Sequence, residues 1–419
     1  MKIDALKIAQ AAKMASKSAG LMTTSQKNKA LLAIAKFIKK YEKEILKENA
    51  KDVLTTEKAG LGPMVDRVLL NKERITGICS DIKNVVSLPD PVGKILSKRK
   101  QPSGLKIQQV SVPFGVILMI YESRPNVTVD AATLALKSGN AVILKGGKEA
   151  INSNRVIIKA IKAALKSVGV NENIVQFVDS VEKDSIADFL KMKSLIDVVI
   201  PRGGKGLINF VVENSSIPAI NTGASVVHTY IDKKFDLKMA VAITVNAKTR
   251  RVSICNTLDT LLVHKDSAQK LLPILAKELA KHDVEIRADK RAHKILNEKY
   301  TKLKRATAQD FDTEFLDYIL AIRVVDNLDE ALTHIEKHSL RHSEAIITSD
   351  KKSAERFLNE VDAACVYVNA TTQFTDGAQF GLGAEIGIST QKLHVRGPFA
   401  LEGLTTYKWK IYGSGQCRK

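Results

Sequence analysis

Residues 112–150 read VPFGVILMIYESRPNVTVDAATLALKSGNAVILKGGKEA, and this stretch decides the fold. Two short apolar runs, Val116–Tyr121 and Ala141–Leu144, enclose a segment with helical spacing of its apolar residues. Fully apolar runs joined by a helix are typical of neighbouring strands in a parallel sheet, because both faces of such a sheet are covered. Similar runs at Ile174–Val178 and Ile196–Ile200 extend the pattern. We therefore predict an α/β protein with a parallel sheet of dinucleotide-binding type.

Two of these predicted strands run into glycine-rich basic loops. LKGGKEA covers Leu144–Ala150, and PRGGKG covers Pro201–Gly206. Ligands of open parallel sheets bind beyond the carboxyl ends of the strands, where backbone N–H groups at a helix start suit phosphate oxygens. Neither loop is the G-x-G-x-x-G fingerprint, and a glycine turn between strand and helix is also common structure. Two such loops in one sheet nevertheless favour a phosphate-binding edge.

A second alternation of strands and helices follows Val226 and carries one cysteine in a polar loop. The stretch 246–264, NAKTRRVSICNTLDTLLVH, places Cys255 between a helical pattern and an apolar strand. The thiolate is the reactive form of cysteine, and Arg250 and Arg251 would favour it over the thiol. The alternative is a small buried core residue, because cysteine is often buried.

The other three cysteines help to decide between these alternatives. Cys79 shares a helical stripe with isoleucines and Cys365 lies in the strand-like run ACVYVN, so both are expected in the core. Cys417 lies in a terminal tail. The spacing predicts neither a disulfide framework nor a metal site, which suits a reducing compartment. We therefore take Cys255 as the candidate nucleophile and expect a cytoplasmic protein.

Length and charge limit the class of protein. A chain of 419 residues with 45% hydrophobic residues is long enough for two or three domains. The formal charge of +20 raises nucleic-acid binding as a rival function. The lysines are interleaved with acidic residues, in KFIKKYEKEILKENAK and KHDVEIRADKRAHK, as on solvated helix faces, and no nucleic-acid-binding motif occurs. No apolar run is long enough to span a bilayer, so we expect neither nucleic acid nor membrane as a partner.

The remaining segments suggest a strand arm. The first hundred residues have helical periodicity, and LPDPVG at residues 88–93 breaks the chain. LKIQQVSV, from Leu105 to Val112, alternates as an exposed strand, and GLTTYKWKIYG near the carboxyl end alternates as well. We expect these two strands to pair. The glycine-rich stretch 374–398 reads as a shaped loop.

Several long motifs together resemble one family. They are the opening stretch 112–150, VIPRGGKGLINFVVEN, VNAKT with the CN of Cys255 and Asn256, HSEAIITSD, YVNATTQFTDG and FGLGAEIGISTQKLHVRGP. Over essentially its whole length the chain resembles the gamma-glutamyl phosphate reductase (glutamate-5-semialdehyde dehydrogenase) branch of the aldehyde dehydrogenase superfamily. The resemblance implies NADPH-dependent reduction of L-glutamyl 5-phosphate to L-glutamate 5-semialdehyde and phosphate, in proline biosynthesis.

The resemblance also implies the chemical roles at the reacting carbon. Cys255 would expel phosphate and form a thioester that accepts hydride. Asn126, with the backbone N–H of Cys255, would stabilise the negative charge on the carbonyl oxygen. The alternative for Asn126 is a turn cap beside Pro125. Arg124 and Arg251 are the candidate substrate-binding cations. Asn221 stands where related hydrolytic enzymes carry a glutamate base, so the thioester should be spared hydrolysis.

For the cofactor the resemblance implies contacts from both parts of the chain. Lys145, with Gly146, would bind the ribose phosphate of NADPH, and Glu314 would hold the nicotinamide ribose. The residues expected near the pyrophosphate are Arg202, Gly203 and Gly204. No metal is expected.

The implied fold is aldehyde dehydrogenase-like, with a Rossmann-type cofactor domain, an α/β catalytic domain and a small β arm for oligomerisation. The expected ranges are 1–100 and 118–232 for the NADPH-binding domain, 233–398 for the catalytic domain, and 101–117 with 399–419 for the oligomerisation strands. A homo-oligomer is expected, and glutamate 5-kinase is a candidate partner.

The sequence departs from the family at four positions. Arg250 and Val252 replace a usual glutamine and proline, and Ser225 and Val227 stand where glycine and cysteine are common. The alternative functions are another acyl-phosphate or aldehyde dehydrogenase of the superfamily, or a basic scaffold without catalysis.

Overall fold

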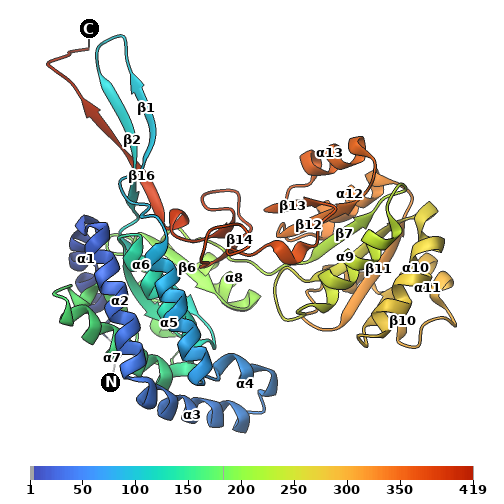
Figure 1. The fold of residues 1–419 in the computed structure, drawn as a ribbon, viewed down its shortest axis with the longest axis horizontal. Coiled ribbons are helices and arrows are strands. Elements are labelled where there is room, and N and C mark those ends of the chain that lie inside the picture. The colour runs from blue at the N-terminus through green and yellow to red at the C-terminus, as the bar shows by residue number, and fades with distance from the viewer. Residues whose placement is uncertain (1–3, 183, 419) are drawn as a thin grey trace. The chain divides into compact units, whose positions relative to one another are not determined.

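The computed structural model describes residues 4–182 and 184–418, which divide into two compact units (Figure 1). Unit 1 comprises the chain up to residue 222 together with 381–387 and 399–419, and unit 2 comprises 223–380 and 388–398. Each unit is built around its own parallel sheet, so the predicted α/β class is confirmed. None of the described helices is both long and apolar enough to cross a lipid bilayer.

The sheet of unit 1 has the strand order β5-β4-β3-β6 and is parallel throughout. Its strands are β3 (Val116–Tyr121), β4 (Ala141–Lys145), β5 (Val175–Phe177) and β6 (Val198–Arg202). Helix α6 (Pro125–Lys137) joins β3 to β4, α7 (Ile151–Ser167) leads to β5, and α8 (Lys205–Asn214) follows β6. Every residue of β3 is buried, as expected for a strand covered on both faces. The strand order reverses between β3 and β6, and ligands of such sheets bind at this switch point.

Five helices form the amino-terminal part of unit 1 and confirm the predicted helical region. They are α1 (Ala5–Leu21), α2 (Thr24–Lys40), α3 (Glu42–Lys58), α4 (Gly62–Val68) and α5 (Lys72–Ser87). Helix α1 buries only alanines, which lets it pack closely on β4. Helix α2 begins with a capping box in which Thr23 and Gln26 satisfy each other's backbone N–H groups.

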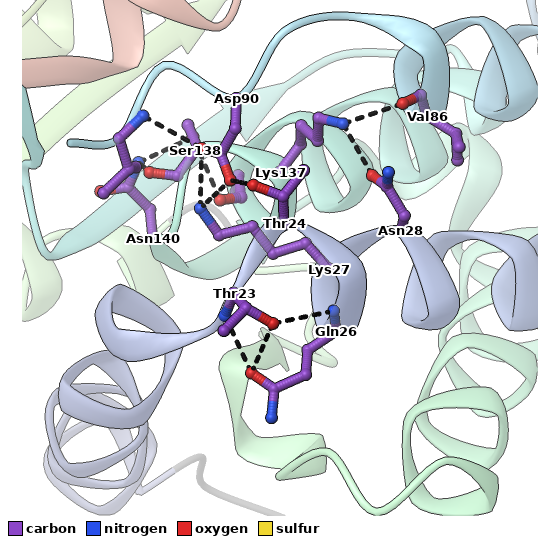
Figure 2. Close-up of polar contacts among 12 residues, drawn as sticks. Thr23, Thr24, Gln26, Lys27, Asn28, Val86, Asp90, Lys137, Ser138 and Asn140 are labelled. Carbon is purple, nitrogen blue, oxygen red and sulfur yellow. Dashed lines mark hydrogen bonds and ion pairs between the residues drawn. The ribbon is translucent and has the colours of Figure 1, made fainter. Parts of the chain in front are cut away.

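Two fully buried lysines hold the end of α5 and the LPDPVG turn that follows it (Figure 2). The Lys27 ammonium lies 2.9 Å from the Asp90 carboxylate of the turn. Lys137 on α6 donates to the Asn28 side chain at 2.7 Å and to the Val86 carbonyl near the end of α5 at 2.9 Å. Breaking a buried ion pair by removing one partner costs about 3–5 kcal/mol, so this network fixes where the chain leaves α5.

A three-stranded antiparallel sheet forms the arm of unit 1 (Figure 1). Strand β2 (Lys106–Pro113) pairs with β16 (Thr405–Tyr412), which confirms the predicted pairing of the two exposed strands. The third strand is β1 (Ile95–Lys100), whose residues were predicted as part of the helical region and of the cofactor domain, so the prediction is wrong here. ILSKRK is exposed along nearly its whole length, so it lacks the apolar alternation that identifies a strand.

Unit 2 contains a seven-stranded parallel sheet with the order β10-β9-β11-β8-β7-β12-β13. Its strands are β7 (Val227–Ile231), β8 (Leu258–His264), β9 (Glu285–Ala288), β10 (Leu303–Arg305), β11 (Ile319–Val325), β12 (Ser343–Ile347) and β13 (Cys365–Val368). Its helices are α9 (Leu237–Thr249), α10 (Lys265–Ala280), α11 (Lys290–Leu296), α12 (Leu328–His338) and α13 (Lys351–Glu360). The glycine-rich loop contributes the short pair β14 (Gly387–Ser389) and β15 (Gly397–Phe399).

The prediction that KHDVEIRADKRAHK forms a solvated helix face is wrong in part. Within KHDVEIRADKRAHK, residues 285–288 form β9, an interior strand of the sheet. Ile286 and Ala288 are buried, whereas Glu285 and Arg287 lie on the other face, where Arg287 Nε is 2.7 Å from the Glu285 carboxylate. The strand was missed because every second side chain is charged and ion-paired, which in the sequence resembles a solvent-exposed surface.

The boundaries of the units differ from the residue ranges assigned from the sequence. Strand β7 lies within 223–232 but pairs with β8 and β12 of the second sheet. Residues 381–387 belong to unit 1, and Val116 and Ile117 begin its central strand rather than ending the arm. Strand pairing, which the sequence does not display, sets these limits.

Candidate functional site

The carboxyl edge of the unit 1 sheet gathers most of the predicted site residues. The loops that leave β3, β4 and β6 start side by side, because these strands are parallel neighbours. The predicted residues at this edge are Arg124, Asn126, Lys145, Gly146, Arg202, Gly203 and Gly204. The structure thus brings the two glycine-rich loops together at the switch point.

Lys145, the last residue of β4, is buried and bound to its own chain. Only 6% of its surface is exposed. Its ammonium donates to the carbonyls of Gly146 at 3.0 Å and Ser180 at 2.9 Å. Burial lowers the pKa of Lys145, and Glu149 partly offsets this. An ammonium has three N–H donors, so one is left beyond these two bonds for an anionic ligand.

The second glycine-rich loop holds a carboxylate of the same chain. Glu122 follows β3, and its Oε2 accepts the backbone N–H of Gly204 at 2.9 Å, at the start of α8. A Cβ at Gly203 would lie 2.5 Å from the Glu122 carboxyl carbon, so any larger residue there would make the Glu122 side chain shift. A carboxylate is favoured at a helix amino terminus. The position expected for a phosphate therefore already carries an anion, and Glu122 was not among the predicted residues.

The adjoining residue, Ser123, has the features of a ligand cradle. Its φ of 53° lies in the left-handed region, which is uncommon for serine. Its hydroxyl is buried and has no hydrogen-bond partner among the described residues. The backbone nitrogen of Ser123 lies 3.0 Å from where a Cβ of Gly147 would be. A close glycine approach beside an orphaned hydroxyl fits the phosphates and ribose of a dinucleotide.

Asn126 lies inside the first turn of α6 and does not cap it. Its amide donates to Asp130 at 3.0 Å, one turn further along the helix. Burial raises the pKa of Asp130 to about 6, with Arg202 and Asn126 acting in the opposite direction and Asp81 adding to the rise. Arg202 also donates to the carbonyl of Ile386 at 2.8 Å, which ties the glycine-rich loop of unit 1 to β6. Arg124 is half-buried at the amino cap of α6.

In unit 2, Cys255 is half-buried in the connection between α9 and β8, as predicted. The loop around it is clamped by Gln373, whose amide donates to the carbonyl of Ala247 at 3.0 Å and accepts from Arg250 at 3.2 Å. Asn256, next to the thiol, donates to the carbonyl of Thr375 at 2.9 Å. Gln373 was missed because its motif, YVNATTQFTDG, was read only as part of a resemblance.

The predicted core position is confirmed for Cys365 but not for Cys79, which is half-buried. Cys79 is half-buried on α5 with its thiol 3.5 Å from the carbonyl of Ala35, Cys365 is buried in β13, and Cys417 is exposed. Among residues 4–182 and 184–418, no three histidine, cysteine or acidic side chains lie together as metal ligands would.

A buried pair of opposite charges lies below the Cys255 loop. Lys248 is fully buried, and its ammonium donates to the carbonyl of Leu258 at 3.0 Å. Asp259, at the start of β8, accepts the backbone N–H groups of Val227 and Phe315, both at 3.1 Å. Burial lowers the pKa of Lys248 and raises that of Asp259, and each charge partly offsets the shift of the other.

The remaining predicted residues also belong to unit 2. Glu314 precedes β11, and the hydroxyl of Ser225 donates to its Oε1 at 3.0 Å. Burial raises the pKa of Glu314, whereas the bonds from Ser225 lower it. Arg251 is exposed, and its carbonyl accepts the Thr257 hydroxyl at 2.7 Å. Cys255, Ser225 and Glu314 each precede a strand, so they lie toward the amino edge of the second sheet.

The family model for the aldehyde dehydrogenase family matches residues 2–295. A relative from Dictyoglomus turgidum, a gamma-glutamyl phosphate reductase, is 50% identical over 97% of this chain and 98% of its own. The chain belongs to the gamma-glutamyl phosphate reductase family of aldehyde dehydrogenases. The resemblance inferred from the motifs is therefore confirmed, and the chain is an oxidoreductase.

Solved structures agree with membership of this aldehyde dehydrogenase family. The crystal structure of gamma-glutamyl phosphate reductase from Thermotoga maritima is 44% identical, with a TM-score of 0.97 and complete coverage of both chains. An engineered glycolyl-CoA reductase with bound NADP+ shares only the fold, at 15% identity and a TM-score of 0.68 over 97% of this chain and 96% of its own.

Proposed function

We propose that the protein reduces L-glutamyl 5-phosphate to L-glutamate 5-semialdehyde and phosphate with NADPH, in proline biosynthesis. The observation that carries the proposal is the 50% identity, over nearly the whole chain, to a relative named for this reaction. The half-buried thiol of Cys255 in a clamped loop supports it, because the reaction needs a positioned nucleophile.

Cys255 is the proposed nucleophile. Its thiolate attacks the acyl carbon, the carbon–oxygen bond to phosphate breaks, and phosphate leaves with the bonding electrons to give a thioester. Bound NADPH supplies the hydride that reduces this thioester. The carbon–sulfur bond then breaks, so that the aldehyde leaves and the thiolate is restored. Asn126 remains the candidate donor to the carbonyl oxygen, since its amide has a second N–H beyond the one given to Asp130.

The cofactor contacts are proposed on the features of the two sheet edges. Lys145, with Gly146, would bind the extra phosphate of NADPH through its remaining N–H, and Gly203 and Gly204 with Arg202 would lie near the pyrophosphate. Glu314 would hold the nicotinamide ribose. Arg124 and Arg251 are proposed to bind the acidic substrate, for which a guanidinium offers paired donors.

Two further features belong to this proposal. Asn221 cannot act as a proton-accepting base, so the thioester should persist until hydride or phosphate reaches it. The arm exposes apolar side chains on β16, including Trp409 and Ile411 at 46% and 60%, which supports a homo-oligomer assembled through these strands. We place the enzyme in the cytoplasm, where thiols stay reduced, with glutamate 5-kinase as a partner that supplies the unstable substrate.

The test is an assay in both directions. In the forward direction, NADPH oxidation is followed while a kinase makes glutamyl phosphate in the same vessel. In the reverse direction, glutamate semialdehyde, NADP+ and phosphate should give NADPH, whereas other aldehydes should not. Activity with other aldehydes would indicate a different dehydrogenase of the superfamily. Rapid glutamate formation without phosphate would contradict the reductive assignment, and salt-sensitive nucleic-acid binding without reduction would favour a scaffold.

A further inference from the structure

Two separate segments of unit 2 are joined by a buried side-chain contact. Glu314 lies between the 3₁₀ helix Ala308–Asp312 and β11, and Ser225 lies just before β7. The Ser225 hydroxyl donates to Oε1 of Glu314 at 3.0 Å, and Ser225 is only 1% exposed. Position 225 is one where the family resemblance led us to expect glycine, which has no hydroxyl.

A second contact joins the same two segments. The carboxylate of Asp259 accepts the N–H of Val227, two residues after Ser225, and the N–H of Phe315, the residue after Glu314. Asp259 is itself fixed, because it belongs to β8 and is 1% exposed. Together the two contacts hold the backbone next to Ser225 and next to Glu314, and they hold the Glu314 carboxylate, which also accepts a hydrogen bond from the Ser225 backbone.

We infer that Ser225 and Asp259 are positioning residues that hold Glu314 in the orientation in which it binds the cofactor. The inference rests on the proposed role of Glu314 at the nicotinamide ribose. A carboxylate binds a sugar hydroxyl well only when its oxygens are directed at the ligand, and a glutamate side chain otherwise rotates freely. Ser225 engages Oε1, so Oε2 is the oxygen assigned to the ribose hydroxyls.

The alternative is that Ser225 only satisfies a buried loop. Both roles predict a loss of stability when the hydroxyl is removed, because a buried acceptor loses its donor. Only the positioning role predicts a specific loss of cofactor affinity. Ser267 offers a matched control, since it is buried in the same unit and its hydroxyl donates at 2.8 Å to the carbonyl of Asp232.

The experiment compares the variants Ser225→Ala, Ser225→Thr, Ser267→Ala and Glu314→Gln in the full-length protein. NADPH affinity is measured by fluorescence titration, KM and kcat for NADPH by the forward assay, KM and kcat for NADP+ by the reverse assay, and Tm by thermal melting. Ser225→Ala should weaken NADPH binding about three- to tenfold, which corresponds to one hydrogen bond. Ser225→Thr, which keeps the hydroxyl, should restore most of the affinity. Ser267→Ala should lower Tm to a similar extent and leave NADPH affinity within about twofold.

The outcomes separate this inference from the proposed function. If Glu314→Gln weakens NADPH binding but Ser225→Ala behaves like Ser267→Ala, the positioning role is overturned and the role of Glu314 stands. If neither variant changes NADPH affinity while the wild type still reduces glutamyl phosphate, both the positioning role and the ribose assignment of Glu314 are overturned, but the reaction is not. A wild type that binds no NADPH would contradict the proposed function itself.

Discussion

The candidate residues of unit 1 and unit 2 lie at opposite kinds of sheet edge. In unit 1 the loops that carry Lys145, Glu122 and Gly204 follow the carboxyl ends of parallel strands, where ligands of open sheets bind. In unit 2, Cys255 and Glu314 precede strands and therefore lie toward the amino edge. A general rule of α/β folds thus locates the first set, whereas the second set is recognised only by the chemistry of its side chains.

The two edges also differ in how their polar groups are held. At the edge of unit 1 the charged groups are bonded to backbone, with the Lys145 ammonium on two carbonyls and the Glu122 carboxylate on the N–H of Gly204. A charged ligand that binds here must replace the backbone groups that these side chains now contact. At the edge of unit 2, Gln373 fixes the Cys255 loop and Asp259 fixes the segment next to Glu314, both through hydrogen bonds to backbone groups. We therefore expect changes at Lys145 and Glu122 of unit 1 to alter cofactor binding, and a change at Cys255 of unit 2 to alter the chemical step.

The largest difference between the effect on turnover and the effect on NADPH binding is expected from Cys255→Ser. Serine keeps a weak nucleophile of much higher pKa, so turnover should fall by a factor of about a thousand or more, while NADPH binding stays unchanged. Steady-state rates and cofactor titration measure the two effects. Cys79→Ser, which changes a half-buried thiol of unit 1, is the control and should keep its turnover. Retention of more than about a tenth of the rate by Cys255→Ser would contradict the assignment, since 1.4 kcal/mol of barrier already corresponds to tenfold.

A smaller effect, confined to binding, is expected from Lys145→Met. If the lysine contacts the extra phosphate of NADPH, affinity for NADPH should fall about tenfold more than affinity for NADH. The free energy of unfolding should also fall by about 1–3 kcal/mol, because the carbonyls of Gly146 and Ser180 lose their donor. Lys148→Met removes an exposed charge from the same loop and serves as control. Equal losses for the two cofactors would leave Lys145 with the structural role alone.

The smallest effect is expected from Glu122→Gln. A dinucleotide phosphate at the start of α8 must displace the Glu122 carboxylate or tolerate its charge, so the neutral amide should tighten NADPH binding about two- to fivefold. Glu213→Gln makes the same charge change on an exposed residue near the other end of α8 and should have no effect. Weaker binding by Glu122→Gln would show instead that this carboxylate is a ligand of the cofactor.

Secondary structure was predicted correctly from the sequence where the pattern of apolar residues within one segment was enough to identify it. The all-apolar strands of unit 1 and the alternation of β2 and β16 needed no partner to be recognised. It failed for β1 and β9, whose charged side chains are accommodated by exposure or by ion pairs within the strand and with other segments. Among site residues, the sequence singled out Cys255 because basic neighbours surround a thiol.

The sequence by itself determined the fold class, the glycine-rich loops, the candidate nucleophile and, through long motifs, the family, because each of these is written in consecutive residues. Only the tertiary structure decided which groups those loops meet. Glu122 lies 82 residues before Gly204, and Ser225 lies 89 residues before Glu314. Hydrogen bonds act over about 3 Å in space, whatever the separation along the chain, so these partners appear only once the sheets have formed.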